Sequence, residues 1–520
     1  MVKERSLIRN TAVVGAGTFL SRITGLIREI LVSSSFGASW VTDVFFVAYT
    51  IPNLLRRLFA EGALSTSVIP VFSQYSEKSP KESQKFVYSV FTGLTLVVSM
   101  VCLVGIVFSP WIVEMVGIGF RSEPEKMQMA VNMTRIMFPF LLIISWSALI
   151  MGVLNTLHIF SWSAIAPVFF NVGTILTLLL LKRLAGPYSL AIGVLIGGAG
   201  QFVIQLYPFY KKGFFLRFVK EFWHDPGFRE VIRLMLPVTL ALAVGQLNTL
   251  VDRIIASTCQ EGAVSALYYA DRLLELPLGI FGIALSTAIL PSLSQLVFKN
   301  DLKEWNHTLT QGIRLVLFIM IPVTIYLAIF RKEAIRLIYE RGMFDAVATQ
   351  MTAQSLLFYV PGLAFFSVNH IITKAFYSLK DTVTPVRISV IMVGVNVVLD
   401  LILVRYLSFS GLALATSLVA VLNSIWLFFS LKKKHAFYKK DHTFLYWLVK
   451  IIIINLLFTG ICWVILHFVQ NLTSLHSLLI FFGISLFGLS LIYILVSQFI
   501  GLQEGKSIWF FIVRRVIGKG

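Results

Sequence analysis

Arginines and carboxylates are concentrated in one apolar stretch near the N-terminus, between residues 22 and 61. Arginine keeps its charge in any environment and offers a fork of donors that suits phosphate oxygens. Carboxylates beside such arginines would hold the site together by ion pairing while it is empty. The charged residues of this stretch are Arg22, Arg28, Glu29, Asp43, Arg56, Arg57 and Glu61. Their types and number indicate a binding site for an anion.

Two membrane-spanning helices, joined by a short turn at residues 36–39, must position these side chains. Arg22 lies about 15 residues from the turn, or roughly 22 Å along a helix. Arg56 and Arg57 lie at a similar depth on the returning helix. A charge at the bilayer centre costs about 2.5–3.5 kcal/mol on insertion scales, so these side chains cannot face lipid. We therefore expect them to line a water-filled cavity or to pair inside a helix bundle.

Later helices carry residues of the same kinds, namely Asp252, Arg253, Asp271, Arg272 and Glu275. Ionisable groups inside a membrane usually mark the path of a substrate or an ion. On that ground a binding role is favoured for Arg22, Arg28, Arg57 and Arg272. The alternative is a structural ion pair between helices, and for Glu61, Asp252 and Arg253 the two interpretations have equal weight.

A second set of residues offers oxygen ligands. Asn396 and Asp400 are four positions apart and therefore share one face of a helix. Thr416 on the next helix, and Asp252 in the same half of the chain, could reach them. Such ligands suit a hard cation such as Na⁺, or a proton relay. A hydrogen-bonded contact between helices explains the same residues equally well. We expect no other cofactor, because the three cysteines and eight histidines lack metal-ligand spacing.

The composition is that of an all-α polytopic membrane protein. The chain has 520 residues, of which 57% are hydrophobic and only 13% charged. Apolar runs of spanning length recur to the end of the chain and predict about fourteen transmembrane helices. They lie at 7–35, 40–73, 86–109, 128–153, 160–181, 188–210, 231–258, 263–297, 309–330, 351–378, 384–405, 411–431, 444–468 and 474–500.

The net charge of +19 is explained by topology rather than by nucleic acid binding. Most of the lysines and arginines outside the helices fall in loops on one side, which the positive-inside rule places in the cytoplasm. An even number of helices then puts both termini in the cytoplasm. The outer loop at 331–345 is also basic and does not follow this pattern.

The chain contains an internal repeat. Residues 63–74 read ALSTSVIPVFSQ, and residues 284–295 read ALSTAILPSLSQ. Further matches follow in register, so helices 1–6 correspond to helices 7–12 in the same orientation. Repeats of this kind are typical of transporters, with the substrate site between the halves. We expect an N-lobe at 1–215, a C-lobe at 216–436, two added helices at 437–502 and a basic cytoplasmic tail at 503–520.

Four segments carry a resemblance to a known family: SRITGLIRE at 21–29, FGASWVTDVFFVAYTIPNLLRRLFAEGALS at 36–65, YYADRLLELPLGIFGIALSTAILPSLS at 268–294 and FYSLKDTVTPV at 376–386. They resemble the MurJ (MviN) family of lipid II flippases, within the multidrug/oligosaccharidyl-lipid/polysaccharide exporter superfamily. The resemblance implies a transporter that moves the undecaprenyl-pyrophosphate-linked peptidoglycan precursor across the bacterial inner membrane by alternating access, supporting cell wall synthesis and cell shape.

The resemblance also assigns roles to individual residues. The residues it implies for the headgroup are Arg22, Arg28, Arg56, Arg57 and Arg272, with Asp43 and Asp271 as acids of a central cationic cavity. Glu29 stands where many relatives carry Asp. The added helices would form a groove for the lipid tail. The implied partners are lipid II, the bilayer and other cell wall synthesis proteins.

Two alternatives within the superfamily remain open at this point. A flippase for another lipid-linked oligosaccharide would need the same arginines, because headgroup identity depends on cavity shape. A cation-coupled drug exporter would instead have an aromatic pocket with one or two acids. A membrane enzyme is disfavoured, since no nucleophile motif is present and most outer loops are short.

Overall fold

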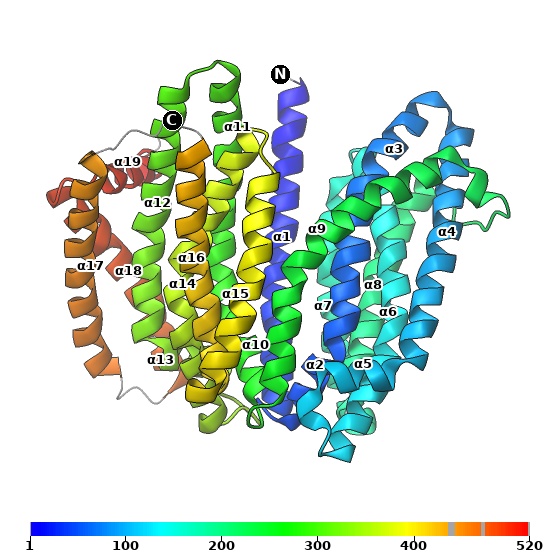
Figure 1. Cartoon of the computed structure of the whole chain (residues 1–520), viewed down its shortest axis with the longest axis horizontal. Coiled ribbons are helices and arrows are strands. Elements are labelled where there is room, and N and C mark those ends of the chain that lie inside the picture. The colour runs from blue at the N-terminus through cyan, green and yellow to red at the C-terminus, as the bar shows by residue number, and fades with distance from the viewer. Residues whose placement is uncertain (1, 435–441, 470–473, 518–520) are drawn as a thin grey trace. The chain divides into compact units, whose positions relative to one another are not determined.

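The computed structural model describes residues 2–434, 442–469 and 474–517, and in these ranges it consists of helices with no strand. Eleven of the described helices are long and apolar enough to cross a membrane. Figure 1 shows them as long helices. This confirms the predicted all-α polytopic fold. Lys439, Lys440 and the last three residues of the chain lie outside the described ranges.

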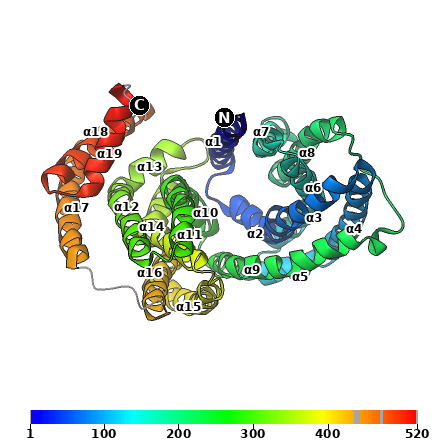
Figure 2. The same cartoon turned by 90° about the horizontal axis from the view of Figure 1, so that it is seen from above.

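The chain forms two compact units, which we describe separately. Unit 1 contains residues 1–265 and the short segment Arg341–Asp345. Its elements are α1 (Val2–Phe36), α2 (Trp40–Leu55), η1 (Arg56–Leu64), α3 (Ser65–Lys78), α4 (Pro80–Val107), α5 (Ser109–Val116), η2 (Ile118–Phe120), α6 (Pro124–Thr156), α7 (Phe160–Ala185), α8 (Tyr188–Lys211), η3 (Phe222–His224) and α9 (Pro226–Ser257). In this unit α6, α7 and α8 pack side by side, with α1 against α7 (Figure 2).

Unit 2 contains the remaining residues. Its elements are α10 (Ala263–Pro277), whose first turn belongs to unit 1, η4 (Leu278–Ile283), α11 (Ala284–Phe298), α12 (Leu302–Ile329), α13 (Arg331–Ile338), α14 (Ala346–Ser378), α15 (Val383–Leu407), α16 (Phe409–Lys434), α17 (His442–Val469), α18 (Leu475–Phe499) and α19 (Gln503–Ile517). The helix α14 packs on α16, α12 and α11, so it forms the core of this unit.

Three more helices have spanning length: α1, the continuous helix of α2, η1 and α3, and α9. With these three, the helices of spanning length in the described residues match the predicted fourteen. The repeat assigns α9 to the second lobe, whereas its contacts in the structure are with η1, α3 and α4 of unit 1. The lobe boundaries expected from the repeat stay a prediction.

The repeat reappears in unusual local conformations at matching positions. The segments η1 and η4 are both π-helical, and they begin at Arg56 and Leu278, 222 positions apart. The short helices α5 and α13 begin 222 positions apart as well. Gly186 and Ser408 are also 222 positions apart, and each has a positive φ in the connection between two consecutive helices. Each π segment follows a proline, Pro52 or Pro277, and π turns bend a helix.

The added helices α17 and α18 lie side by side and pack on α12 through aromatic side chains (Figures 1 and 2). The Tyr326 hydroxyl lies 2.8 Å from the Ser485 hydroxyl in a buried contact. The ring centroids of Phe318 and Tyr493 are 5.0 Å apart. These contacts attach the two added helices to the repeat of unit 2.

The turn between α14 and α15 is fixed by Asp381. Its carboxylate accepts hydrogen bonds from the Thr384 amide at 3.0 Å and from the Lys434 ammonium at 2.8 Å. Burial raises the pKa of the Asp381 carboxyl, but the hydrogen bonds from Lys434 and Thr384 outweigh it and hold the pKa at about 2. The Asp381 carboxylate therefore ties the end of α16 to the start of α15.

This turn predicts a pH dependence of stability. Because the folded-state pKa lies below the ordinary value of 3.8, the contribution of Asp381 is present above that value. It is lost as the pH falls from about 4 towards 2. In thermal unfolding of the detergent-solubilised protein, wild type should melt above Asp381→Asn at neutral pH, and the two should converge at low pH. The difference should be small and should shrink with salt, because Lys434 is half exposed. A constant difference down to the lowest pH would contradict this account.

Candidate functional site

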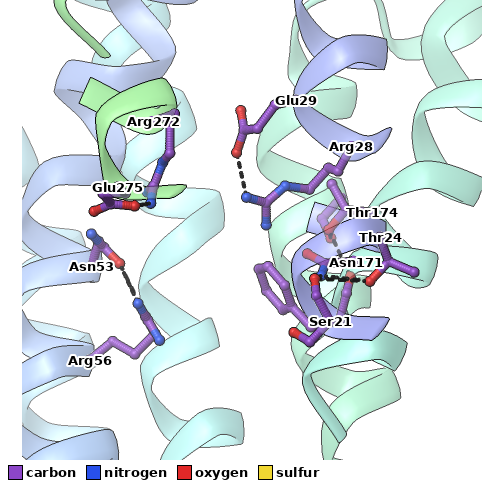
Figure 3. Close-up of polar contacts among 12 residues, drawn as sticks. Ser21, Thr24, Arg28, Glu29, Asn53, Arg56, Asn171, Thr174, Arg272 and Glu275 are labelled. Atoms are coloured by element: carbon purple, nitrogen blue, oxygen red, sulfur yellow. Dashed lines mark hydrogen bonds and ion pairs between the residues drawn. The ribbon is translucent and has the colours of Figure 1, made fainter. Parts of the chain in front are cut away.

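The side chain of Arg28 lies between α1 and α7. Its guanidinium is 2.5 Å from the Glu29 carboxylate and 5.5 Å from the centre of the Phe170 ring (Figure 3). Glu29 is buried, while 21% of the Arg28 side chain is exposed. The pair thus places a buried carboxylate beside an arginine whose side chain is partly exposed. This is the arrangement expected of an anion site that is stable when empty.

One turn below, Asn171 of α7 fastens α1 in place. Its amide donates to the Ser21 carbonyl at 3.0 Å and to the Thr24 hydroxyl at 3.1 Å (Figure 3). A Cβ at Gly25 would lie 3.5 Å from the Asn171 amide, an ordinary contact distance, so α1 packs closely on α7 here. Arg22, on the same helix, is exposed. The helix α1 therefore presents two arginines on a firmly packed base.

Arg56 and Arg57 open the π segment η1. The Arg56 guanidinium donates to the Asn53 side-chain oxygen at 2.9 and 3.0 Å (Figure 3). Arg57 reaches Gln246 of α9 at 3.4 Å. Both guanidiniums are half-buried, and each donates to the side-chain amide oxygen of a neutral residue. The side chain of Glu61 lies outside the part of the chain whose side chains are described.

Asp43 lies in a different environment. It is 4% exposed, and both carboxylate oxygens accept hydrogen bonds from the turn that precedes α10. The Gly262 amide donates at 2.6 Å, the Ser265 amide at 2.8 Å and the Ser265 hydroxyl at 2.6 Å. A carboxylate so placed caps the helix that follows. Asp43 therefore stabilises the start of α10. Its contact with a substrate headgroup stays a prediction.

In unit 2, Arg272 pairs with Glu275 one turn further along α10 at 2.5 Å (Figure 3). Its guanidinium also lies 4.9 Å from the centre of the Tyr268 ring. Its side chain is 30% exposed. The neighbouring Asp271 is exposed on the same helix. As with Arg28, an arginine is held by an acid and a ring and is still accessible.

Arg253 contacts the start of α10. Its guanidinium donates to the Val264 carbonyl at 2.9 Å and lies 5.8 Å from the Phe46 ring. The structural interpretation, one of the two that the sequence left open, therefore accounts for this residue.

The oxygen ligands are only partly brought together. The Asn396 amide donates to the Asp400 carboxylate at 2.6 Å, and both side chains are buried. Thr416 lies on the neighbouring helix α16, where its hydroxyl donates to the Leu412 carbonyl at 3.0 Å. Asp252 is half-buried and belongs to unit 1. Among the described residues no group of three or more His, Cys, Asp or Glu side chains has metal-binding geometry.

Comparison with known proteins decides the family. A family model described as "Lipid II flippase MurJ" matches residues 32–483. A Vibrio cholerae protein named probable lipid II flippase MurJ is 38% identical over 435 residues, which are 82% of this chain and 83% of that protein. The chain belongs to the lipid II flippase MurJ family. A Burkholderia cenocepacia lipid II flippase MurJ is 37% identical over 82% of this chain and 84% of its own length.

Solved structures agree with this placement. A lipid II flippase MurJ in an inward closed conformation superposes with a TM-score of 0.79 at 30% identity, covering 94% of this chain and 98% of that one. An inward-facing MATE family transporter of the MOP superfamily gives 0.65 at 14% identity and supports the fold alone. As a MurJ family member, the protein is a transporter rather than an enzyme, and a multi-pass protein of the bacterial inner membrane. These predictions are confirmed.

The sequence of this MurJ family member did not reveal which uncharged side chains bind its arginines. Arg56 binds Asn53, and Arg57 binds Gln246. Asn171 binds the backbone of α1. The available signal was a polar amide inside an otherwise apolar helix, since such a group must find a hydrogen-bond partner in a membrane. The sequence does not say which charged residue that partner supports.

Proposed function

We propose that this protein flips the undecaprenyl-pyrophosphate-linked peptidoglycan precursor, lipid II, from the inner to the outer leaflet by alternating access. The observation that carries the proposal is the set of partly exposed arginines inside spanning helices, of which Arg28 and Arg272 pair with acids and Arg56 and Arg57 bind amides. A pyrophosphate offers oxygens for several guanidiniums at once. Arg22, Arg28, Arg56, Arg57 and Arg272 would bind the headgroup, and Asp271 would act as a nearby acid.

Depletion of the protein in its own cell tests this function. Lipid-linked peptidoglycan precursor should accumulate on the inner leaflet, and cells should lose their shape and lyse. Accumulation of a different lipid-linked oligosaccharide would favour the related alternative. A drug exporter is disfavoured by these arginines, because a pocket for cationic drugs should not collect positive charge.

The remaining expectations belong to the same proposal. Both termini would lie in the cytoplasm, which agrees with the basic residues after α8 and at the end of α16. The aromatic-lined helices α17 and α18 would guide the lipid tail. Enzymes that make or consume lipid II are the expected partners.

We propose that a monovalent cation, Na⁺ or H⁺, drives the cycle through Asp252, Asn396, Asp400 and Thr416. The support is the buried Asn396–Asp400 pair, because a carboxylate inside a membrane helix is costly unless it is paired or coordinates a cation. Moving one charge through about 100 mV supplies roughly 2.3 kcal/mol. That energy shifts a two-state equilibrium about fiftyfold.

The variant Asp400→Asn tests cation coupling, since it keeps the size of the side chain and removes its charge. We expect transport in reconstituted vesicles to lose its dependence on Na⁺ or on membrane potential. Ser417→Ala, a change on α16 next to Thr416, is the matched control and should keep that dependence. Normal, ion-responsive transport by Asp400→Asn would place the coupling site elsewhere.

A further inference from the structure

The link between α8 and α9 exposes aromatic side chains. The exposed fractions are 44% for Phe215, 68% for Phe218 and 58% for Trp223. The last turns of α8 add Tyr207 and Tyr210, exposed by 61% and 42%. Basic residues alternate with these rings. We call the set the interfacial platform, and it consists of Tyr207, Tyr210, Lys211, Lys212, Phe215, Arg217, Phe218, Lys220 and Trp223.

The platform rests on an ordered backbone. The Gln84 amide of α4 donates to the Gly213 carbonyl at 2.7 Å, and the Val219 amide donates to the Thr92 hydroxyl of α4 at 3.0 Å. At the far end, the buried Asp225 carboxylate accepts from Ser89 of α4 at 3.2 Å. These contacts fix which residues of the link point outward. The exposed rings are therefore presented by the fold.

Cations and rings of the platform are paired. The Lys211 ammonium lies 5.9 Å from the Tyr207 ring, and the Arg217 guanidinium lies 5.9 Å from the Phe215 ring. The Tyr210 and Phe215 rings stack at 5.8 Å with an interplanar angle of 22°. Each pair thus places an apolar ring and a positive charge at the same level. The boundary between acyl chains and headgroups favours both groups at one depth.

We propose that the interfacial platform binds anionic phospholipid headgroups. The site begins at the end of the spanning helix α8, so its rings enter the membrane boundary. Four cations against one carboxylate, Glu221, give it a charge complementary to an anionic lipid. The platform holds this end of unit 1 at the bilayer surface. This inference does not depend on what the protein transports, so the two proposals fail independently.

Fluorescence of Trp223 in nanodiscs tests the platform. The signal is the difference between the wild-type protein and Trp223→Phe, measured with brominated phosphatidylglycerol or brominated phosphatidylcholine as quencher. We expect phosphatidylglycerol to quench at the lower mole fraction. R217Q/K220Q should reduce that preference by about fivefold for each charge removed. K299Q/K303Q removes the same charge from other exposed lysines and should leave the preference unchanged.

Two results would overturn the proposal. Equal quenching by the two lipids would show that Trp223 meets lipid without selecting its charge. Quenching by aqueous iodide but by neither lipid would place the platform in water, where a soluble protein is the better occupant. If the double variant fails to elute as a folded monodisperse protein, Lys220→Gln alone measures the same preference.

Discussion

Arg28→Ala should abolish transport while the protein still folds and inserts. The guanidinium lies beside Glu29 and Phe170, and 21% of the Arg28 side chain is exposed. A lost charge-assisted contact of about 3 kcal/mol corresponds to roughly a hundredfold fall in substrate affinity. The measurement is complementation of a depleted strain, with membrane abundance and melting temperature recorded for each variant.

Two further variants sharpen this test. Arg28→Lys should restore only part of the activity, because an ammonium keeps the charge and lacks the two-pronged geometry of the guanidinium. Arg183→Ala is the matched control, since it removes an exposed arginine at the end of α7 in the same unit. Full complementation by Arg28→Ala at normal abundance would refute the anion site on α1.

Asp43→Ala should act in the opposite way, by destabilising the fold. Removal of the carboxylate leaves the buried amides of Gly262 and Ser265 without their acceptor and uncaps α10. The expected cost is roughly 2–4 kcal/mol in the free energy of unfolding. Thermal unfolding in detergent and abundance in the membrane measure this loss directly.

The same turn provides the control for Asp43. Glu261 is exposed, and its carboxylate accepts a 3.2 Å hydrogen bond from the Trp40 amide and lies 3.7 Å from the Lys126 ammonium, contacts that are worth little at an exposed side chain. Glu261→Ala should therefore change the melting temperature little. Asp43→Asn keeps one acceptor oxygen and should fall between wild type and Asp43→Ala. A normal melting temperature for Asp43→Ala, with transport lost, would return Asp43 to the substrate site.

Properties that depend on periodicity and length were predictable from the sequence. Apolar runs located the helices because a lipid-facing helix must be apolar for about 20 residues. The motif shared by residues 63–74 and 284–295 revealed the repeat, which the matching conformations at Arg56 and Leu278 support. Charges inside apolar runs identified candidate site residues without any knowledge of their neighbours.

Contacts between distant segments could not be predicted. Asp43 accepts hydrogen bonds from Gly262 and Ser265, which lie more than 200 positions away in the sequence. The residues around Asp43 give no indication of these partners. Arg253 is similar, because its acceptor is a backbone carbonyl, which every residue carries. The π segments could not be predicted from the sequence either, because one extra residue in a helical turn leaves the amino-acid composition almost unchanged.

The paired π segments bear on the history of the chain. A π turn arises when a helix gains one residue without being disrupted, and two independent gains would rarely fall at matching places. The segments η1 and η4 begin 222 positions apart, which is also the separation of α5 from α13. The simplest account is that the ancestral half already carried the extra residue when its gene was duplicated. The widened turn is then older than the two-lobed transporter, and only one copy, which begins at Arg56 and Arg57, carries arginines at its start.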